Sequence, residues 1–349
     1  MYNREVLPNP GQLVTNGKFN FGIYTEPFQV INPLDAKSPM GIPLPATLQN
    51  LRLKEWQAIQ IGTDRFFMIA AIFNAKVMSL VQLKIYDKKL KKKYLYERRV
   101  SPWSIQVANS LWDTTSSFHD NDFRILMHND IGADRIRLEI DIKNFQDLPN
   151  IKGSFEGWHD LNQVTPLVVC MPFDTNQGMY SHKCPMPMQG EFQIDEETIV
   201  CETRRAFMLI DDHKGYYPYT MQWDWVTGAG WDNQGRFIGF NFTDNQVIQK
   251  MRYNENAVWI NGKLNLLPPI KMARVDGVDG MWHIRDGFDR VDIKFYPEVP
   301  GAVDINYLIA ESRYRGPFGR FEGTIRTLDG DHIFLDQFFG MGEKFYLRV

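Results

Sequence analysis

The apolar residues of this 349-residue chain recur with a period of two, in runs bounded by turn-forming residues. This period is typical of β-strands, because successive side chains point to opposite faces of a sheet. At least fifteen segments fit the pattern, whereas amphipathic helical patterns are almost missing. We therefore expect an all-β protein. Clear examples are residues 55–73, 78–86, 122–130 and 135–145.

Two dipeptides between strand candidates are typical of tight hairpins. Asn261-Gly262 follows the run "AVWI", and Asp329-Gly330 follows the run "GTIRTL". Both dipeptides accept the positive φ angles that short hairpin loops demand. Consecutive hairpins produce an antiparallel meander, and a meander of this length closes into barrels or stacks as a sandwich.

The first fifty residues differ from the rest of the chain because they are rich in proline. Proline removes a backbone donor and disfavours long helices and central strands, so we expect an extended arm over residues 1–50. The remaining chain is too long for one ordinary core and suggests two domains of about 150–200 residues. We place them at 51–187 and 188–349, divided at a proline-dense link. The prolines of the arm are at positions 8, 10, 27, 33, 39, 43 and 45.

Composition and charge exclude several classes of protein. The formal net charge is −3, and the basic run over residues 87–99 is best explained as a solvated hairpin tip, so we expect no nucleic-acid partner. Three cysteines without two-residue spacing argue against a disulfide scaffold. The N-terminus has no signal-like apolar core, and the longest apolar run is half of a membrane span. We expect a soluble, cytoplasmic protein with no membrane span, and the oligomeric state stays open.

Motifs for cofactors and metals are missing from the sequence. It contains no phosphate-binding glycine loop, no dinucleotide fingerprint and no H-E-x-x-H pair. The seven histidines never lie two, three or four residues apart, so no local pattern indicates a metal site. We predict neither a cofactor nor a bound metal.

The segment "YTMQWDWVT" at residues 219–227 is a candidate wall of a binding site. Alternation places Trp223 and Trp225 on one face, and Gln222 and Asp224 on the other, a face that Asn241 of the following strand is expected to share. In a water-poor cavity the pKa of Asp224 would rise, which suits a general acid. The alternative is that Asp224 faces solvent while the tryptophans belong to the core.

The polar run from Asp211 to Lys214 ends a strand candidate just before this wall. A carboxylate and an imidazole at a strand end can divide acid and base roles. Adjacent strand residues point to opposite faces, however, so Asp211 and Asp212 are not expected to act on one atom. Glu255 and Asn256, with Trp259 beyond them, form a further polar cluster, whereas the pair His182-Lys183 is interpreted as structural.

Several segments resemble known families. The runs "AFMLIDDHKGYY" and "MQWDWVTGAGWDNQGRFIGFNF" are similar to the signature of the group of hydroxyneurosporene synthase, tocopherol cyclase and AttH-like proteins. A closer likeness, in "KEWQAIQIGTDRFF", "YNENAVWINGK" and "GPFGRFEGTIRTLDG", is to a bacterial family defined by a domain of unknown function. The resemblance implies two calycin-type, lipocalin-like antiparallel β-barrels packed side by side.

The resemblance also implies handling of a small hydrophobic molecule without a cofactor, by hydration, cyclisation or isomerisation, in a barrel or interdomain pocket. Asp224, Asp212 and His213 are then the candidate catalytic residues. Two alternatives stay open: a lipocalin-like binder or carrier that performs no reaction, and a carbohydrate-active or carbohydrate-binding protein with exposed aromatic platforms. The candidate ligand-binding residues are Tyr216, Tyr219, Gln222, Trp223, Trp225, Asn241, Glu255, Asn256 and Trp259.

Overall fold

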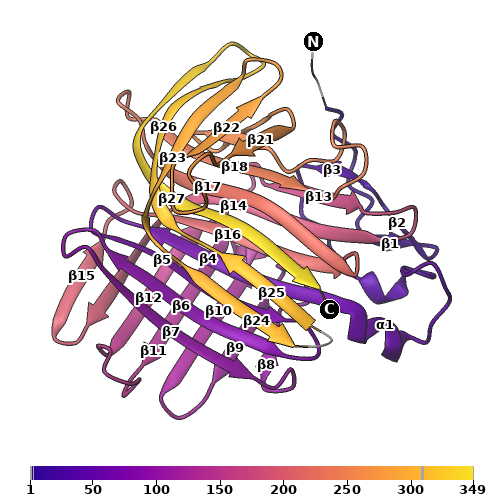
Figure 1. The fold of residues 1–349 in the computed structure, drawn as a ribbon, viewed down its shortest axis with the longest axis horizontal. Coiled ribbons are helices and arrows are strands. Elements are labelled where there is room, and N and C mark those ends of the chain that lie inside the picture. Colours follow the sequence, from indigo (N-terminus) through magenta and orange to yellow (C-terminus); the bar gives the residue numbers. More distant parts are fainter. Residues whose placement is uncertain (1, 3, 308–309, 349) are drawn as a thin grey trace.

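The computed structural model describes residues 2, 4–307 and 310–348, and nearly all of its elements are β-strands (Figure 1). The expected all-β class is therefore confirmed. In the described part of the chain, helical structure is confined to α1 (Ala46–Arg52) and the 3₁₀ turns η1 (Pro33–Asp35) and η2 (Ile131–Ala133). None of these helices has the length and hydropathy that a membrane span requires.

The proline-rich N-terminal arm contains only short strands: β1 (Val14–Thr15), β2 (Lys18–Phe19) and β3 (Gly22–Tyr24). β1 and β2 pair with each other, and β3 pairs with β13 (Leu167–Pro172) at the edge of a large sheet. The arm also packs Tyr24 and Phe28 against Tyr180, which shields these aromatic side chains from solvent.

The first large sheet is antiparallel and wraps around a core of aliphatic and aromatic side chains. β13 and β15 (Glu197–Cys201) pair with its longest strand, β14, off the main path. The main path runs in the order β7 (Lys92–Val100), β6 (Ser79–Asp87), β5 (Phe66–Asn74), β4 (Leu53–Gly62), β16 (Phe207–Tyr216), β14 (Gly178–Ile194), β12 (Ile151–Trp158), β11 (Arg135–Ile142), β10 (Phe123–Asp130), β9 (Thr114–His119) and β8 (Ile105–Gln106).

The second large sheet is also antiparallel and encloses an aromatic-rich core of its own. A hairpin of β24 (Ala302–Tyr307) and β25 (Ala310–Arg315) joins it through pairing of β25 with β27. The main path runs in the order β20 (Lys263–Leu266), β19 (Ala257–Ile260), β18 (Phe237–Asn245), β17 (Thr220–Trp231), β27 (His332–Arg348), β26 (Phe318–Arg326), β23 (Val291–Val299), β22 (Trp282–Asp286) and β21 (Ile270–Ala273).

The two barrel-like sheets lie side by side, as the family resemblance implied, and a third apolar core joins them (Figure 1). In this core the ring of Phe67 on β5 meets the edge of Phe318 on β26, at 4.8 Å between centroids. The chain changes sheet in the link between β16 and β17, whereas the domain boundary expected at 187/188 falls inside β14. The division of the chain into domains stays a prediction.

Local chemistry accounts for the hairpins. Asn261 and Gly262 adopt φ angles of 49° and 84° between β19 and β20, as expected for a tight turn that requires two left-handed residues. Each of the three cysteines is buried and free.

Candidate functional site

A pocket of about 800 Å³ lies between the two sheets, outside both barrel interiors. Alternation on β4 explains its first wall: Ile59 points into the first barrel, so Trp56 and Ala58 point out toward the second sheet. The opposite wall comes from β17 and β27, and the β24–β25 hairpin contributes a third side. Most of the lining is apolar, including Ile69, Phe73, Leu80, Met221, Trp223, Trp225, Phe345 and Leu347.

One part of this apolar pocket is charged. We call Lys183, Asp211, His213 and Glu255 the polar corner. Lys183 on β14 is ion-paired with Asp211 on β16, and His213 Nε2 lies 2.8 Å from Asp211 Oδ1 and 3.0 Å from Lys183 Nζ. Asp211 and His213 are two residues apart on one strand and therefore share a face.

The charges of the polar corner stabilise one another. Burial opposes ionisation of Asp211, but His213 and Lys183 outweigh that effect and hold the pKa of this carboxyl below its usual range. Burial likewise disfavours the charged form of Lys183, yet Asp211 and Glu255 raise the pKa of its ammonium group. Nζ of Lys183 also lies 4.9 Å from the ring centroid of Trp225, a cation–π contact. Lys183 and Asp211 are therefore ionised together near neutral pH.

Glu255 reaches the polar corner from the segment that precedes β19. Its Oε1 accepts a hydrogen bond from Ser181 and lies 3.8 Å from Lys183 Nζ and 3.9 Å from His213 Nε2. Its backbone carbonyl accepts a hydrogen bond of 2.7 Å from Asn241, whose own side-chain oxygen accepts one of 2.6 Å from Trp225. Glu255 is thus fixed at both its side chain and its backbone.

Aromatic rings cover the polar corner. Trp56 is stacked on His213, with ring centroids 4.4 Å apart and planes 14° from parallel. The same indole lies 5.5 Å from Tyr217 and 5.7 Å from Trp223, and its N–H is 3.3 Å from Asp211 Oδ2. These rings exclude water, which strengthens the electrostatic interactions beneath them.

A third buried carboxyl lies in the pocket, outside the polar corner. Glu343 on β27 accepts hydrogen bonds from the indole of Trp223 at 3.1 Å and from the hydroxyl of Tyr314 at 2.7 Å. Burial raises the pKa of Glu343 although both hydrogen bonds favour the ionised form. A raised pKa increases the fraction of the carboxyl that holds a proton at a given pH, and a general acid must hold one.

The structure brings five of the sequence-predicted site residues to the pocket and places Asn241 directly behind Trp225. Asp224 lies on the other face of β17, where it pairs with Arg274 at 3.0 Å. Asn241 does not share that face as expected, because β18 pairs Asn241 with Thr227, which belongs to the tryptophan face. The five pocket residues are His213, Gln222, Trp223, Trp225 and Glu255.

The other predicted residues lie outside the pocket. Asp212 and Tyr216 point away from it, toward the interior of the first barrel and the core beneath the arm, because they alternate with Asp211 and His213. Trp259 is buried and donates to the carbonyl of Thr165, and Asn256 bonds backbone groups. Tyr219 is 56% exposed beyond the end of the pocket.

Sequence reasoning missed Trp56, Lys183, Glu343 and Tyr314 as site residues. Lys183 stood out in the sequence as a charged residue beside His182, but that pair was interpreted as structural. Glu343 carried no signal, because its role depends on the pairing of β27 with β17, more than a hundred residues away in the sequence.

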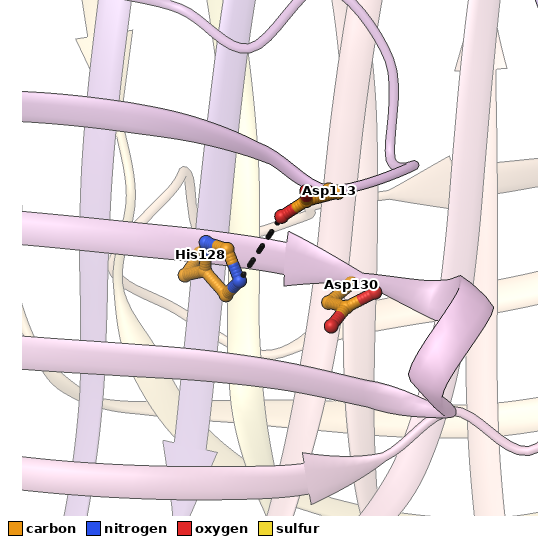
Figure 2. Close-up of side chains that lie close together, drawn as sticks. All are labelled: Asp113, His128 and Asp130. Carbon is orange, nitrogen blue, oxygen red and sulfur yellow. Dashed lines mark ion pairs between the residues drawn. The ribbon is translucent and has the colours of Figure 1, made fainter.

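Asp113, His128 and Asp130 form the one group of metal-ligand type in the described residues, with ligand atoms within 4.8 Å of one another. Figure 2 shows Asp113 reaching toward His128, which it approaches to 3.7 Å. Asp130 accepts from the amide of Ala133 and caps η2. The ion pair and the cap explain these side chains, and the group is not part of the pocket lining.

These observations define the class: an all-β protein of two barrel-like antiparallel sheets with an apolar pocket between them. A family model described as a domain of unknown function (DUF2804) matches residues 3–348. The chain belongs to the DUF2804 family, so the expected membership of a family of unknown function is confirmed. No curated protein matches the sequence.

Two solved structures are similar to this one. Kievitone hydratase from Nectria haematococca gives a TM-score of 0.48 at 10% identity, covering 84% of this chain and 88% of that chain. An AttH-like protein from Nitrosomonas europaea gives a TM-score of 0.47 at 11% identity, covering 85% of this chain and 93% of that chain.

Proposed function

We propose that the protein is an enzyme that binds an uncharged, mainly hydrocarbon molecule between its sheets and moves a proton on it with its own side chains. Hydration, cyclisation and isomerisation are the reaction types that fit. The observation that supports the proposal is the polar corner, a set of four interacting ionisable groups in a pocket whose lining is mostly apolar.

The charges of the pocket argue for a neutral substrate. Lys183 and Asp211 neutralise each other, and Arg99 at the edge of the pocket lies 3.5 Å from Glu97. An anionic ligand would lose its hydration without gaining an unpaired positive charge among the described pocket residues, which is unfavourable. A cationic ligand would face Glu343, the pKa of which burial raises, so that its neutral form is favoured. A carbonyl, a hydroxyl or an alkene avoids this cost. The volume of the pocket is in the range of sites for small organic ligands.

Roles follow from the geometry. Asp211 Oδ1 lies 2.8 Å from Nε2 of His213; when that nitrogen carries a proton it donates to the carboxylate, which orients the imidazole for acid–base work. Glu343, with its raised pKa, supplies a proton from the opposite wall. The faces of Trp56 and Trp223 are suited to stabilising positive charge that develops on a protonated substrate.

A carrier is the second candidate function, because the polar corner is internally paired and most of the pocket is apolar. A carrier needs only the pocket, whereas an enzyme needs Glu343 and His213 to be chemically competent. A carbohydrate site is less compatible with this lining, because sugars require many hydrogen-bonding groups along the walls.

The experiment begins with mass spectrometry of organic extracts from the purified protein. Molecules that bind are then incubated with wild type and with Glu343→Gln, and conversion is followed by chromatography. We expect Glu343→Gln to retain binding but lose activity by about 10²-fold or more, while the exposed control Asp329→Asn behaves as wild type. Recovery of unchanged ligand with every variant indicates the carrier. If no neutral lipophilic molecule binds, both functions are rejected.

A further inference from the structure

The N-terminal arm contacts the segment that carries Glu255 of the polar corner. We propose that Arg4 is a positioning residue for Glu255, so that the arm completes the site rather than only covering a sheet. The inference rests on the proposed function, since it assigns a role to Glu255 in that site. It starts from the fact that Arg4 is only 5% exposed, which is rare for an arginine and requires buried partners.

The partners of Arg4 are the two backbone carbonyls on either side of Glu255. Nη1 donates to the carbonyl of Asn254, and Nη2 donates to the carbonyl of Asn256. The planar guanidinium therefore bonds the backbone on both sides of Glu255. We call these two hydrogen bonds of Arg4 the clamp. Only arginine offers two donors in this fixed geometry.

Other contacts of the arm secure the same segment. The hydroxyl of Tyr2 donates to the carbonyl of Met251 at 2.8 Å and accepts from the side chain of Asn254 at 2.9 Å. Further along, the amide of Leu7 donates to the carbonyl of Ile23 at 2.8 Å, which ties the arm to β3. The clamp is thus attached to the first sheet, while the segment that it holds belongs to the second.

The segment needs such support because it is not a strand. Residues 246–256 lie between β18 and β19 and form no strand ladder, so individual hydrogen bonds hold their backbone: Asn241 and the amide of Leu267 bond the carbonyls of Glu255 and Asn256, and Arg4 adds two more. Small changes in this backbone would move the carboxylate of Glu255 away from Lys183 and His213. Misplacement of a catalytic group by about 1 Å is enough to lower a rate by 10²-fold.

The charge of Arg4 acts in the same direction as its geometry. Burial lowers the pKa of the guanidinium to about 10, while Tyr2 and Glu255 favour its charged form. Arg4 is therefore a cation at neutral pH and places a second positive charge near Glu255, in addition to Lys183.

The test compares two variants. Arg4→Gln removes both the charge and the paired donors of the guanidinium, whereas Arg4→Lys keeps the charge but not the paired donors. Arg205→Gln is the matched control, because Arg205 is exposed and its one ion-pair partner among the described residues is Asp64. The first readout is hydrogen exchange at the amide of Asn256, which bonds the side chain of Asn254 at 3.0 Å. We expect protection there to fall at least 10-fold in both Arg4 variants, and amides of β10 and β11 to be unchanged. Unchanged protection at Asn256 overturns the proposal.

The second readout separates positioning from general stability. With a converted substrate, we expect Arg4→Gln to lower kcat at nearly constant KM, and the double variant Arg4→Gln/Glu255→Gln to be no slower than Glu255→Gln alone. Additive losses overturn the proposal. If Asn256 loses protection but Glu255→Gln leaves conversion unchanged, Arg4 holds the segment without serving the reaction, and the proposal that the arm completes the site is overturned while the proposed function stands. If neither wild type nor any variant converts a bound molecule, the proposed function fails, and the protection at Asn256 still decides whether Arg4 holds the segment. Tyr2→Phe gives a milder version of the same test should Arg4→Gln not fold.

Discussion

Asp212 differs sharply from its neighbour Asp211. Asp211 faces the pocket with a lysine and a histidine as partners, whereas Asp212 faces the first barrel, where neither of its oxygens has a hydrogen-bond partner among the described residues. Its cross-strand neighbours are His182 and Gln57. Burial raises the pKa of Asp212 to about 6, with Lys214 and His213 opposing the shift.

The raised pKa of Asp212 has a definite effect on stability. The folded protein holds the proton more tightly than the unfolded chain, whose carboxyl has a pKa of about 3.8, so stability is lost as pH rises from about 4 to about 6. Asp212→Asn cannot ionise. We therefore expect the free energy of unfolding of Asp212→Asn, relative to that of wild type, to increase by about 3 kcal/mol between pH 4 and pH 7. Urea denaturation measures this difference. Parallel pH profiles for the two proteins would contradict this.

Asp211 gives the opposite prediction. Asp211→Asn leaves Lys183 buried without its main counter-charge, which costs roughly 3–5 kcal/mol for buried pairs. Because the pKa of Asp211 is held below its usual range, wild type keeps this contribution until the pH falls well below 4. Denaturation at pH 7 measures the loss. Asp329→Asn serves as the exposed control and should leave stability unchanged.

The sequence predicted side-chain directions at this scale better than side-chain partners. Alternation correctly separated Trp223 and Trp225 from Asp224. It did not reveal which face meets the pocket, because that depends on where β17 lies relative to the first sheet. Asp224 instead pairs with Arg274 from the loop after β21, and no local pattern links the two residues.

Among the elements, β16 is the shared wall between the pocket and the first barrel. It lies between β14 and β4, and it approaches β14 so closely that Gly215 has no room for a side chain. A Cβ at position 215 would lie 2.5 Å from the Cα of Met179. The glycine thus sets the spacing of the two strands that carry Lys183 and Asp211.

Gly215→Ala tests this spacing. The added methyl group meets backbone and not a flexible side chain, so we expect a loss of about 3 kcal/mol in stability together with weaker ligand binding. Gly287→Ala is the matched control, since nothing lies within 4 Å of a Cβ there. Thermal unfolding of both variants measures the contrast. Equal melting temperatures of the two variants would show that β14 and β16 can accommodate the added methyl group without loss of stability.

β14 also shows why the element boundaries were harder to predict than the elements. Pro185 and Pro187 suggested a link, yet both lie within a strand of 17 residues. Pairing with β13 ends at Lys183, and pairing with β12 begins at Met188, so one edge of β14 is unpaired at the prolines. Residues two apart direct their amides to the same edge, so both missing donors fit that gap.

At the scale of the whole molecule, the junction between the sheets contains a buried lysine. Lys84 on β6 donates to the carbonyl of Gly316, in the link between β25 and β26, and lies 3.7 Å from the ring centroid of Phe318 on β26. Burial lowers the pKa of Lys84 to about 7, with Lys93 acting in the same direction and Glu343 against it.

Lys84 makes the stability of the assembly depend on pH. Between about pH 7 and pH 10 the unfolded chain binds a proton that the folded protein does not, so stability rises with pH. We expect the free energy of unfolding of Lys84→Met, relative to that of wild type, to be highest near pH 6–7. This difference should decrease by roughly 3–5 kcal/mol toward pH 10. The exposed Lys89→Met is the control and should follow wild type. Guanidinium denaturation across this range provides the measurement.

The sequence predicted two barrel-like sheets, but it left open whether a ligand lies in a barrel or between the domains. Large side chains such as Phe155 and Trp282 are fully buried in the barrel interiors, whereas the pocket is made by outer faces of both sheets. Contacts such as Phe67 with Phe318 join distant parts of the chain, and no periodicity in the sequence encodes them.

Because the walls of the pocket come from both sheets, a bound molecule also holds the two sheets together. A molecule bound there touches β4 and β17 at once, so separating the sheets means releasing it. At a hundredfold excess over its dissociation constant, such a molecule adds about 2.7 kcal/mol to the stability of the folded chain. The melting temperature of the intact protein therefore reports occupancy directly, and a library of neutral lipophilic compounds can be screened by heat alone.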